Sequence, residues 1–257
     1  MRNLMTIWML AAMVSLKAQE VHDSVFTKTG FPVHLYSEHL GQERKIFIHL
    51  PVGHDTSQSY PLVVLLDGEV SFKAFAGATE LMSWQRLIPP CIVVGIVNVQ
   101  RDMDYAPLVE DIPGSGRADT MLAFYRDELF PYLEERFNIS GRIIWGHSWT
   151  GFFVTYTMLK EPSLFDAYIV TSPALDLLDS VTDPENPFGK IQGLRIKYFM
   201  SLGGEERVSE KMKQFISRLE NDAPETLEAE MMIREGKNHD SNALPGYMDG
   251  LEFVFRR

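Results

Sequence analysis

The chain has 257 residues, of which 45% are hydrophobic and 23% are charged, and its formal net charge at pH 7 is −11. A chain of this length can bury a sizeable core. The negative charge argues against nucleic acid or an anionic membrane as a partner, because both would repel a negative protein surface. The charge does not argue against a small-molecule or glycan substrate.

The N-terminus has the pattern of a secretory signal peptide. Residues 1–18, MRNLMTIWMLAAMVSLKA, combine a positive start at Arg2, an apolar run over residues 4–16 and a small residue, Ala18. This run is too short for a membrane-spanning helix. We therefore expect export to the periplasm or the cell exterior, with residues 19–257 forming a single domain. A buried N-terminal helix is the alternative, and no later stretch is apolar enough for membrane insertion.

Apolar runs rich in β-branched residues recur along the chain. FPVHLY and RKIFIHL alternate like half-exposed strands that could pair antiparallel at the start of the domain. The later runs are almost continuously apolar, which is typical of strands covered on both faces. They are YPLVVLLDG (60–68), CIVVGIVNV (91–99), RIIWG (142–146), FDAYIVTSP (165–173) and RIKYFMSLGG (195–204). Cys91, the only cysteine, opens the second of them and cannot form an internal disulfide.

Amphipathic helical segments separate these runs, for example residues 118–137 and 209–221. The alternation predicts an α/β protein with a mainly parallel central sheet, helices on both faces and antiparallel N-terminal strands. In such sheets the reacting groups lie on loops at the carboxyl ends of the strands.

The string GHSWTG, residues 146–151, lies at one such junction. Ser148 follows the run 142–146 and precedes the helical stretch WTGFFVTYTMLK. A strained strand-to-helix turn of this kind carries the nucleophile of many serine hydrolases and needs glycine where the strand and helix are close. Gly146 meets that need, whereas Thr150 occupies the usual place of the second glycine. A capping serine in an ordinary turn is the alternative.

A serine nucleophile needs a base, and His239 is the predicted one. It lies in the polar loop GKNHDSN, between the strand-like TLEAEMMIRE and a last helix. His147 adjoins the serine and is expected to be structural. The seven histidines show no spacing typical of a metal site, so we expect no metal.

The orienting acid should precede the histidine, because the chain order in hydrolases of this layout is serine, acid, histidine. Glu205 and Glu206 follow the glycine turn that ends the run 195–204. Either carboxylate could hold the imidazole, or both could simply favour a helix N-terminus. Asp176 and Asp179 are weaker candidates.

Two backbone N–H groups are candidates for an oxyanion hole. One belongs to Trp149, directly after the nucleophile, and the other to Glu69, in the segment VVLLDGEV.

The chain resembles the esterase D-like family of α/β-hydrolases, and within it the enterochelin esterase-like branch, over roughly residues 25–257. The stretches that carry the resemblance, in order, are YPLVVLLDGE, IVVGIVNVQRDMDYAP, FYRDELFPYLEERF, RIIWGHSWTGFF and NHDSNALPGYMDGLEFVF.

The resemblance implies an α/β-hydrolase fold with Ser148 as nucleophile, His239 as base and Glu206, before Glu205, as the acid. The oxyanion hole would be formed by the N–H groups of Glu69 and Trp149. Arg101 and Asp104 match an Arg-x-x-Asp segment of the family, interpreted as structural or pocket-lining, and Asp176 is a further pocket candidate. Thr150 departs from the family's glycine.

The expected function is a secreted serine carboxylic-ester hydrolase that works through an acyl-enzyme without a metal or organic cofactor. The resemblance points to esters of catecholate siderophores. One alternative is a carbohydrate esterase that removes feruloyl or acetyl groups from polysaccharides. A hydrolase-fold binding protein without activity is the alternative of another class.

Overall fold

The computed structural model describes residues 28–109, 115–180, 183 and 185–256. The predicted signal peptide, residues 1–18, lies outside the described residues and stays a prediction. Within those ranges, none of the helices is both long and apolar enough to cross a bilayer.

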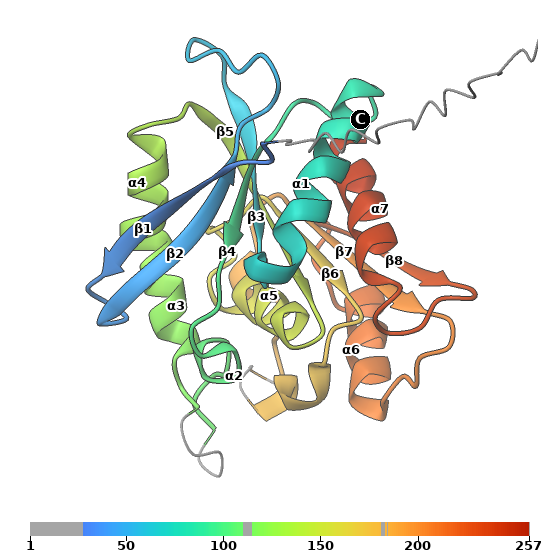
Figure 1. Cartoon of the computed structure of the whole chain (residues 1–257). Coiled ribbons are helices and arrows are strands. Elements are labelled where there is room, and N and C mark those ends of the chain that lie inside the picture. Colours follow the sequence, from blue (N-terminus) through green and yellow to red (C-terminus); the bar gives the residue numbers. More distant parts are fainter. Residues whose placement is uncertain (1–27, 110–114, 181–182, 184, 257) are drawn as a thin grey trace, which may run out of the picture.

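One eight-stranded sheet organises the described chain, with the strand order β1-β2-β4-β3-β5-β6-β7-β8 (Figure 1). β1 pairs antiparallel with β2 and β2 with β4, while every later pair is parallel. The prediction of a mainly parallel sheet with antiparallel N-terminal strands is confirmed. The strands are β1 Phe31–Ser37, β2 Gln42–His49, β3 Tyr60–Leu65, β4 Ile92–Ile96, β5 Ile139–His147, β6 Ala167–Thr171, β7 Ile196–Gly203 and β8 Leu227–Arg234.

Helices cover both faces of this sheet, as predicted. β3 shows why its sequence is continuously apolar: Leu62 and Val64 pack into one hydrophobic cluster, and Val63 and Leu65 into the other. The first cluster includes residues of α3, α4, α5 and α6, and the second includes residues of α1 and α7, which lie side by side in Figure 1. The helices are α1 Gly68–Trp84, α2 Arg101–Asp104, α3 Ala118–Phe124, α4 Phe130–Glu134, α5 Trp149–Lys160, α6 Glu210–Asn221 and α7 Ala243–Phe255, with short 3₁₀ turns at Leu175–Ser180 and Gly189–Ile191.

The helical segment expected over residues 118–137 is interrupted. A π-helical turn, Tyr125–Leu129, separates α3 from α4. Pro131, in the first turn of α4, lacks an N–H, so the carbonyl one α-turn before it loses its usual partner. The wider turn lies where this bond is missing, a detail that hydrophobic periodicity does not show.

A buried ion pair holds the short helix α2 in place. Arg44 on β2 donates to the Asp104 carboxylate at 2.6 Å, and both side chains are almost fully buried. Arg117 lies 3.5 Å from the other Asp104 oxygen. This supports the structural interpretation of Asp104, and it positions Arg101 at the opposite end of the same helix.

Candidate active site

The turn at Ser148 has the backbone geometry of a nucleophile elbow. Ser148 follows β5 directly and precedes α5, with a positive φ of 56° and a ψ of −116°. Its N–H donates to the Thr171 carbonyl at 3.1 Å, and its carbonyl accepts from Phe152 and Ala174, each at 3.0 Å. A positive φ is strained for serine and persists only where the surroundings hold it. These three bonds supply that support from α5 and from the end of β6.

Two glycines permit the close packing around this turn. A Cβ on Gly146 would lie 2.4 Å from the Thr150 carbonyl oxygen, which no side chain could accommodate. A Cβ on Gly151 would meet Pro173 at 3.1 Å, after the end of β6. Gly151 therefore allows α5 to pack closely against the segment after β6, one position later than the second glycine of the family pattern.

Thr150, the departure from that pattern, is fully buried and hydrogen-bonded. Its hydroxyl accepts from the His147 N–H at 2.9 Å. The hydroxyl oxygen also lies 2.9 Å from Asp67 Oδ2 and 2.9 Å from the His147 carbonyl, so its proton can be donated to either. The elbow can form with threonine at this position because the hydroxyl has both a donor and an acceptor within hydrogen-bonding distance.

Thr150→Val should destabilise the protein by about 1–3 kcal/mol, because it keeps the side-chain shape but leaves a buried N–H without its acceptor. Thr150→Ser keeps the hydroxyl and should lose less. Urea unfolding of the two variants and the wild type measures the difference. A valine variant as stable as the serine variant would contradict a role for the hydroxyl.

Asp67 connects the elbow to the start of α1, a role that sequence reasoning missed. It adopts a left-handed conformation with φ 52° and ψ 44° directly before α1. Its carboxylate accepts from Arg101 Nε at 2.6 Å and Nη2 at 3.0 Å, and from Asn98 Nδ2 at 2.7 Å, besides Thr150. The Asp-Gly pair after β3 signals only a turn, so nothing local indicates these four donors.

The two pocket candidates have different surroundings. Arg101 is held by Asp67 through two hydrogen bonds, which raise the pKa of its guanidinium further above the usual range. Asp176 is exposed on the 3₁₀ turn that follows Ala174, and its carbonyl accepts from Lys211. Because Ala174 donates to the Ser148 carbonyl, the segment that carries Asp176 runs past the elbow.

His239 and Glu206 meet in space. Nδ1 of His239 lies 3.4 Å from Oε2 of Glu206, and the Glu206 side chain is only 11% exposed. The other carboxylate oxygen accepts from the Gly203 N–H and the Ser172 hydroxyl, each at 2.5 Å. Glu205 is exposed, and its N–H donates to the Lys237 carbonyl. The geometry therefore favours Glu206 over Glu205 as the orienting acid.

Ser172 and Asn242 are further supports that the sequence did not indicate. Ser172, with φ 48°, is buried and donates to Glu206, while Asn242 donates to the Ser172 hydroxyl at 3.0 Å and to the Ser201 carbonyl at 3.0 Å. These residues come from the ends of β6 and β7 and the start of α7. Their roles depend on contacts between distant segments, so no local motif could have shown them.

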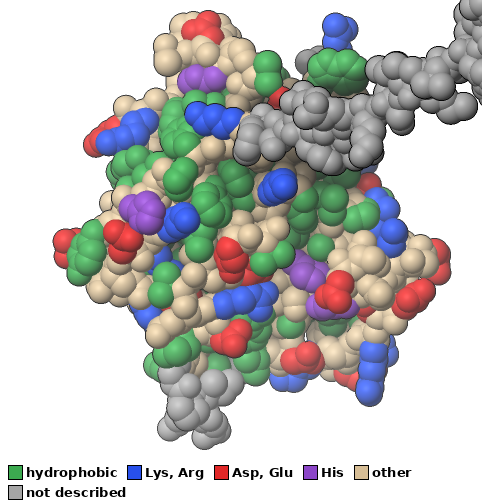
Figure 2. Space-filling view, viewed as in Figure 1, with side chains coloured by type: hydrophobic (Ala, Val, Ile, Leu, Met, Phe, Trp, Pro, Cys, Tyr) green, Lys and Arg blue, Asp and Glu red, His purple; other side chains and the backbone are tan. Residues whose placement is uncertain are grey.

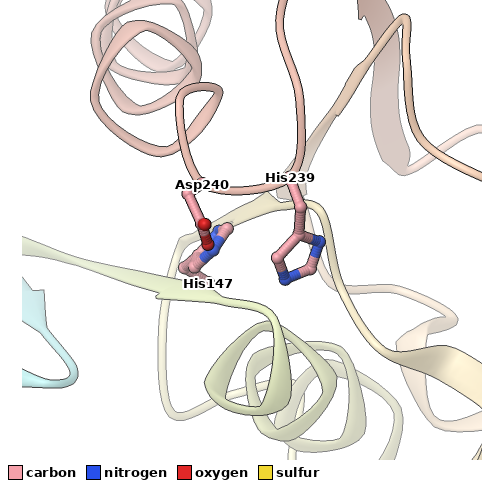
Figure 3. Close-up of side chains that lie close together, drawn as sticks. All are labelled: His147, His239 and Asp240. Atoms are coloured by element: carbon pink, nitrogen blue, oxygen red, sulfur yellow. The ribbon is translucent and has the colours of Figure 1, made fainter.

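His147 lies between the elbow and His239. Its ring centroid is 4.7 Å from that of His239, and its Nδ1 lies 2.9 Å from the Thr171 carbonyl (Figure 3). Burial, followed by the nearby His239, lowers the pKa of His147 below its usual value. The imidazole next to Ser148 is therefore neutral at pH 7, and its ring contacts the loop that carries His239.

The starts of α1 and α5 converge beside this site. Glu69 is the second residue of α1 and Trp149 the first of α5. The first N–H groups of a helix have no acceptor within it, so they can bind an anion. The hydrogen bond from Thr150 to Asp67 joins these two helix starts directly. The Glu69 side chain is held by Asn98, from which it accepts two hydrogen bonds.

The sheet order and the elbow define an α/β-hydrolase. A family model described as "Putative esterase" matches residues 37–241, and the chain belongs to this family. The expected likeness to the enterochelin esterase-like branch is confirmed as well.

Three similar proteins illustrate the relationship. The ferri-bacillibactin esterase BesA of Bacillus subtilis (strain 168) is 26% identical over 179 residues, which are 59% of this chain and 61% of the relative; the chain thus spans about six tenths of that protein's length. An IroE-like serine hydrolase from Shewanella oneidensis is 27% identical, with a TM-score of 0.75 over 88% of this chain and 80% of that structure. The ferulic acid esterase AmCE1/Fae1A from Anaeromyces mucronatus shares the fold, with 20% identity and a TM-score of 0.70 over 93% and 94% of the two chains.

Proposed function

We propose that this protein is a serine carboxylic-ester hydrolase. Ser148 is the nucleophile, His239 the general base, Glu206 the acid that orients His239, and the N–H groups of Glu69 and Trp149 the oxyanion hole. The proposal is carried by the position of His239. Its ring contacts His147, the residue before Ser148, and its Nδ1 faces the Glu206 carboxylate, although His239 comes from a loop far downstream.

The chemistry proceeds in two steps. The Ser148 oxygen attacks the ester carbonyl while Nε2 of His239 takes the hydroxyl proton, and the tetrahedral intermediate collapses as that proton passes to the departing alcohol. Water then attacks the acyl-enzyme, its proton goes to His239, and the acid leaves as Ser148 regains its proton. Glu206 stabilises the imidazolium that forms in each step.

The oxyanion hole follows from the convergence of two helix starts. The N–H groups of Glu69 and Trp149 belong to the first turns of α1 and α5, which also carry the positive ends of the helix dipoles. Each such donor contributes roughly 10²–10³ in kcat in serine hydrolases. Asp67 and Thr150 set the distance between the two turns.

As substrates we propose esters of catecholate siderophores. The similarity to a ferri-bacillibactin esterase supports this class. Of the aromatic side chains in the first turn and a half of α5, Phe152 and Phe153 are buried in the core, whereas Trp149 is half-buried. Its ring stacks on Phe152, with centroids 5.0 Å apart and planes 10° apart. Trp149 can therefore present a rigid flat surface to a catechol ring beside the nucleophile.

Removal of feruloyl groups from polysaccharides is the second candidate, supported by the shared fold with a ferulic acid esterase. A ferulate ring would use the same Trp149 surface. We further propose that the protein acts after export, because the N-terminal residues have the pattern of a signal peptide.

The substrate experiment compares both classes directly. The mature protein is incubated with an iron-free and a ferric triscatecholate trilactone and with a feruloylated arabinose ester, and the products are identified by mass spectrometry. We expect the trilactone to open with addition of one water for each ester cleaved. Release of ferulate alone would favour the carbohydrate esterase. If neither ester is cleaved, and a p-nitrophenyl ester is not cleaved either, the protein is a binder.

A further inference from the structure

Three potential metal ligands lie together beside the elbow. One ligand atom each of His147, His239 and Asp240 falls within 4.8 Å of the other two. His147 ends β5, while His239 and Asp240 belong to the loop between β8 and α7 (Figure 3). The spacing of the histidines in the sequence does not suggest a metal site, because the ligands come from segments far apart.

Both imidazoles are held in the way that metal-binding histidines are held. Nδ1 of His147 lies 2.9 Å from the Thr171 carbonyl, which can only accept, so this nitrogen carries the proton. Nδ1 of His239 faces the Glu206 carboxylate at 3.4 Å. In each ring the lone pair is then on Nε2. A carboxylate or carbonyl partner on the other nitrogen fixes the ring and strengthens it as a ligand.

We propose that His147, His239 and Asp240 bind a divalent transition metal such as Zn²⁺, and that the bound metal inhibits ester hydrolysis. Metal binding follows from the side chains alone. Inhibition rests on the proposed function, because the metal would occupy Nε2 of His239, the atom that must accept the Ser148 proton.

The donor set selects the class of metal. Two imidazoles and one carboxylate suit Zn²⁺, Cu²⁺ or Ni²⁺, whereas Mg²⁺ and Ca²⁺ prefer oxygen ligands alone. Zinc takes its ligands at about 2.0–2.2 Å, which places tetrahedral ligands about 3.4 Å apart. The ligand atoms, which lie within 4.8 Å of one another, must therefore approach by up to about 1.4 Å.

Exposure permits this closure. The His239 side chain is 45% exposed, and Asp240 is exposed on the same loop. In the space-filling view, histidine and acidic side chains lie next to one another on the surface, so an ion can enter from solvent and keep a water as its fourth ligand (Figure 2). The neighbouring Glu206 adds negative charge that favours a cation.

Isothermal titration of the mature protein with ZnCl₂ tests the site without an activity assay. We expect one zinc ion per chain, and at least tenfold weaker binding for His147→Gln and for Asp240→Asn. Absence of zinc binding, or equal affinity in the wild type and both variants, would overturn the proposal. Circular dichroism verifies that the variants are folded, and MgCl₂ serves as the control ion.

Inhibition is measured with a p-nitrophenyl ester, because catecholate substrates chelate zinc themselves. Zinc should inhibit the wild type, and a chelator should restore the rate. Asp240→Asn should keep the basal rate and need at least ten times more zinc for the same inhibition; equal sensitivity would refute the site. Zinc binding in a protein that cleaves no ester would support the metal site and refute the proposed function. Ester cleavage without zinc binding would do the reverse.

Discussion

Ser148→Ala is expected to lower kcat for a p-nitrophenyl ester by about 10⁵–10⁶, the loss typical of removing a serine nucleophile. The methyl group has no oxygen to form the acyl-enzyme, so only the oxyanion hole and substrate binding would remain. KM should change little, because the hydroxyl contributes to the transition state more than to binding. Steady-state kinetics of the purified variant measures both values.

Ser140 offers a matched control for this experiment. It is exposed near the beginning of β5, the strand whose other end leads to Ser148. Ser140→Ala should keep wild-type kinetics. This result would show that the loss of activity in Ser148→Ala comes from that position and not from removing any serine of this segment. Equal, slow hydrolysis by the wild type and by Ser148→Ala would refute the proposal of a serine esterase and support the alternative of a binding protein without activity.

Glu206→Gln should lower kcat by about 10³–10⁴, by analogy with the loss seen when a triad carboxylate becomes an amide. The amide oxygen can still accept from Gly203 and Ser172, which leaves the NH₂ group toward Nδ1 of His239. That arrangement favours the tautomer with the proton on Nε2, so the ring could no longer accept the Ser148 proton.

Glu205→Gln is the neighbouring control and should change kcat by less than about twofold, since the Glu205 side chain is exposed to solvent and substitutions at such positions usually have small effects. The two variants carry the same chemical change one residue apart, and Glu206→Gln should unfold at nearly the wild-type urea concentration. Equal small losses in both would mean that serine and histidine suffice without an orienting acid.

The architecture was largely predictable because it depends on local pattern. The run YPLVVLLDG is apolar at every position that becomes β3, since helices cover both of its faces. The strand-to-helix turn at Ser148 was predictable for a similar reason, because a glycine-bounded turn of this kind is encoded within six residues. The π-helical turn at Tyr125–Leu129 was not, because one missing N–H at Pro131 alters the helix without changing its hydrophobic pattern.

The residues alone left two adjacent glutamates as candidates for the acid, and the family resemblance ranked Glu206 first. The folded chain gives the two side chains different surroundings. The turn after β7 directs Glu206 inward, where Gly203 and Ser172 hold it, and leaves Glu205 in solvent. The threonine at position 150 looked unfavourable in the sequence because one of its hydrogen-bond partners, Asp67, lies far away in the chain, directly before α1. The cluster of His147, His239 and Asp240 likewise exists only where two loops meet.

These differences have one physical origin. Secondary structure and the elbow arise from interactions among residues that are close in sequence, so a short stretch of chain is enough to predict them. The hydrogen bond from Ser172 to Glu206 and the one from Thr150 to Asp67 join segments that only the folded sheet brings together. Residue types alone could therefore point to Ser148 and His239 as candidates, whereas the residues that contact and support them became visible only in the packing of the strand ends.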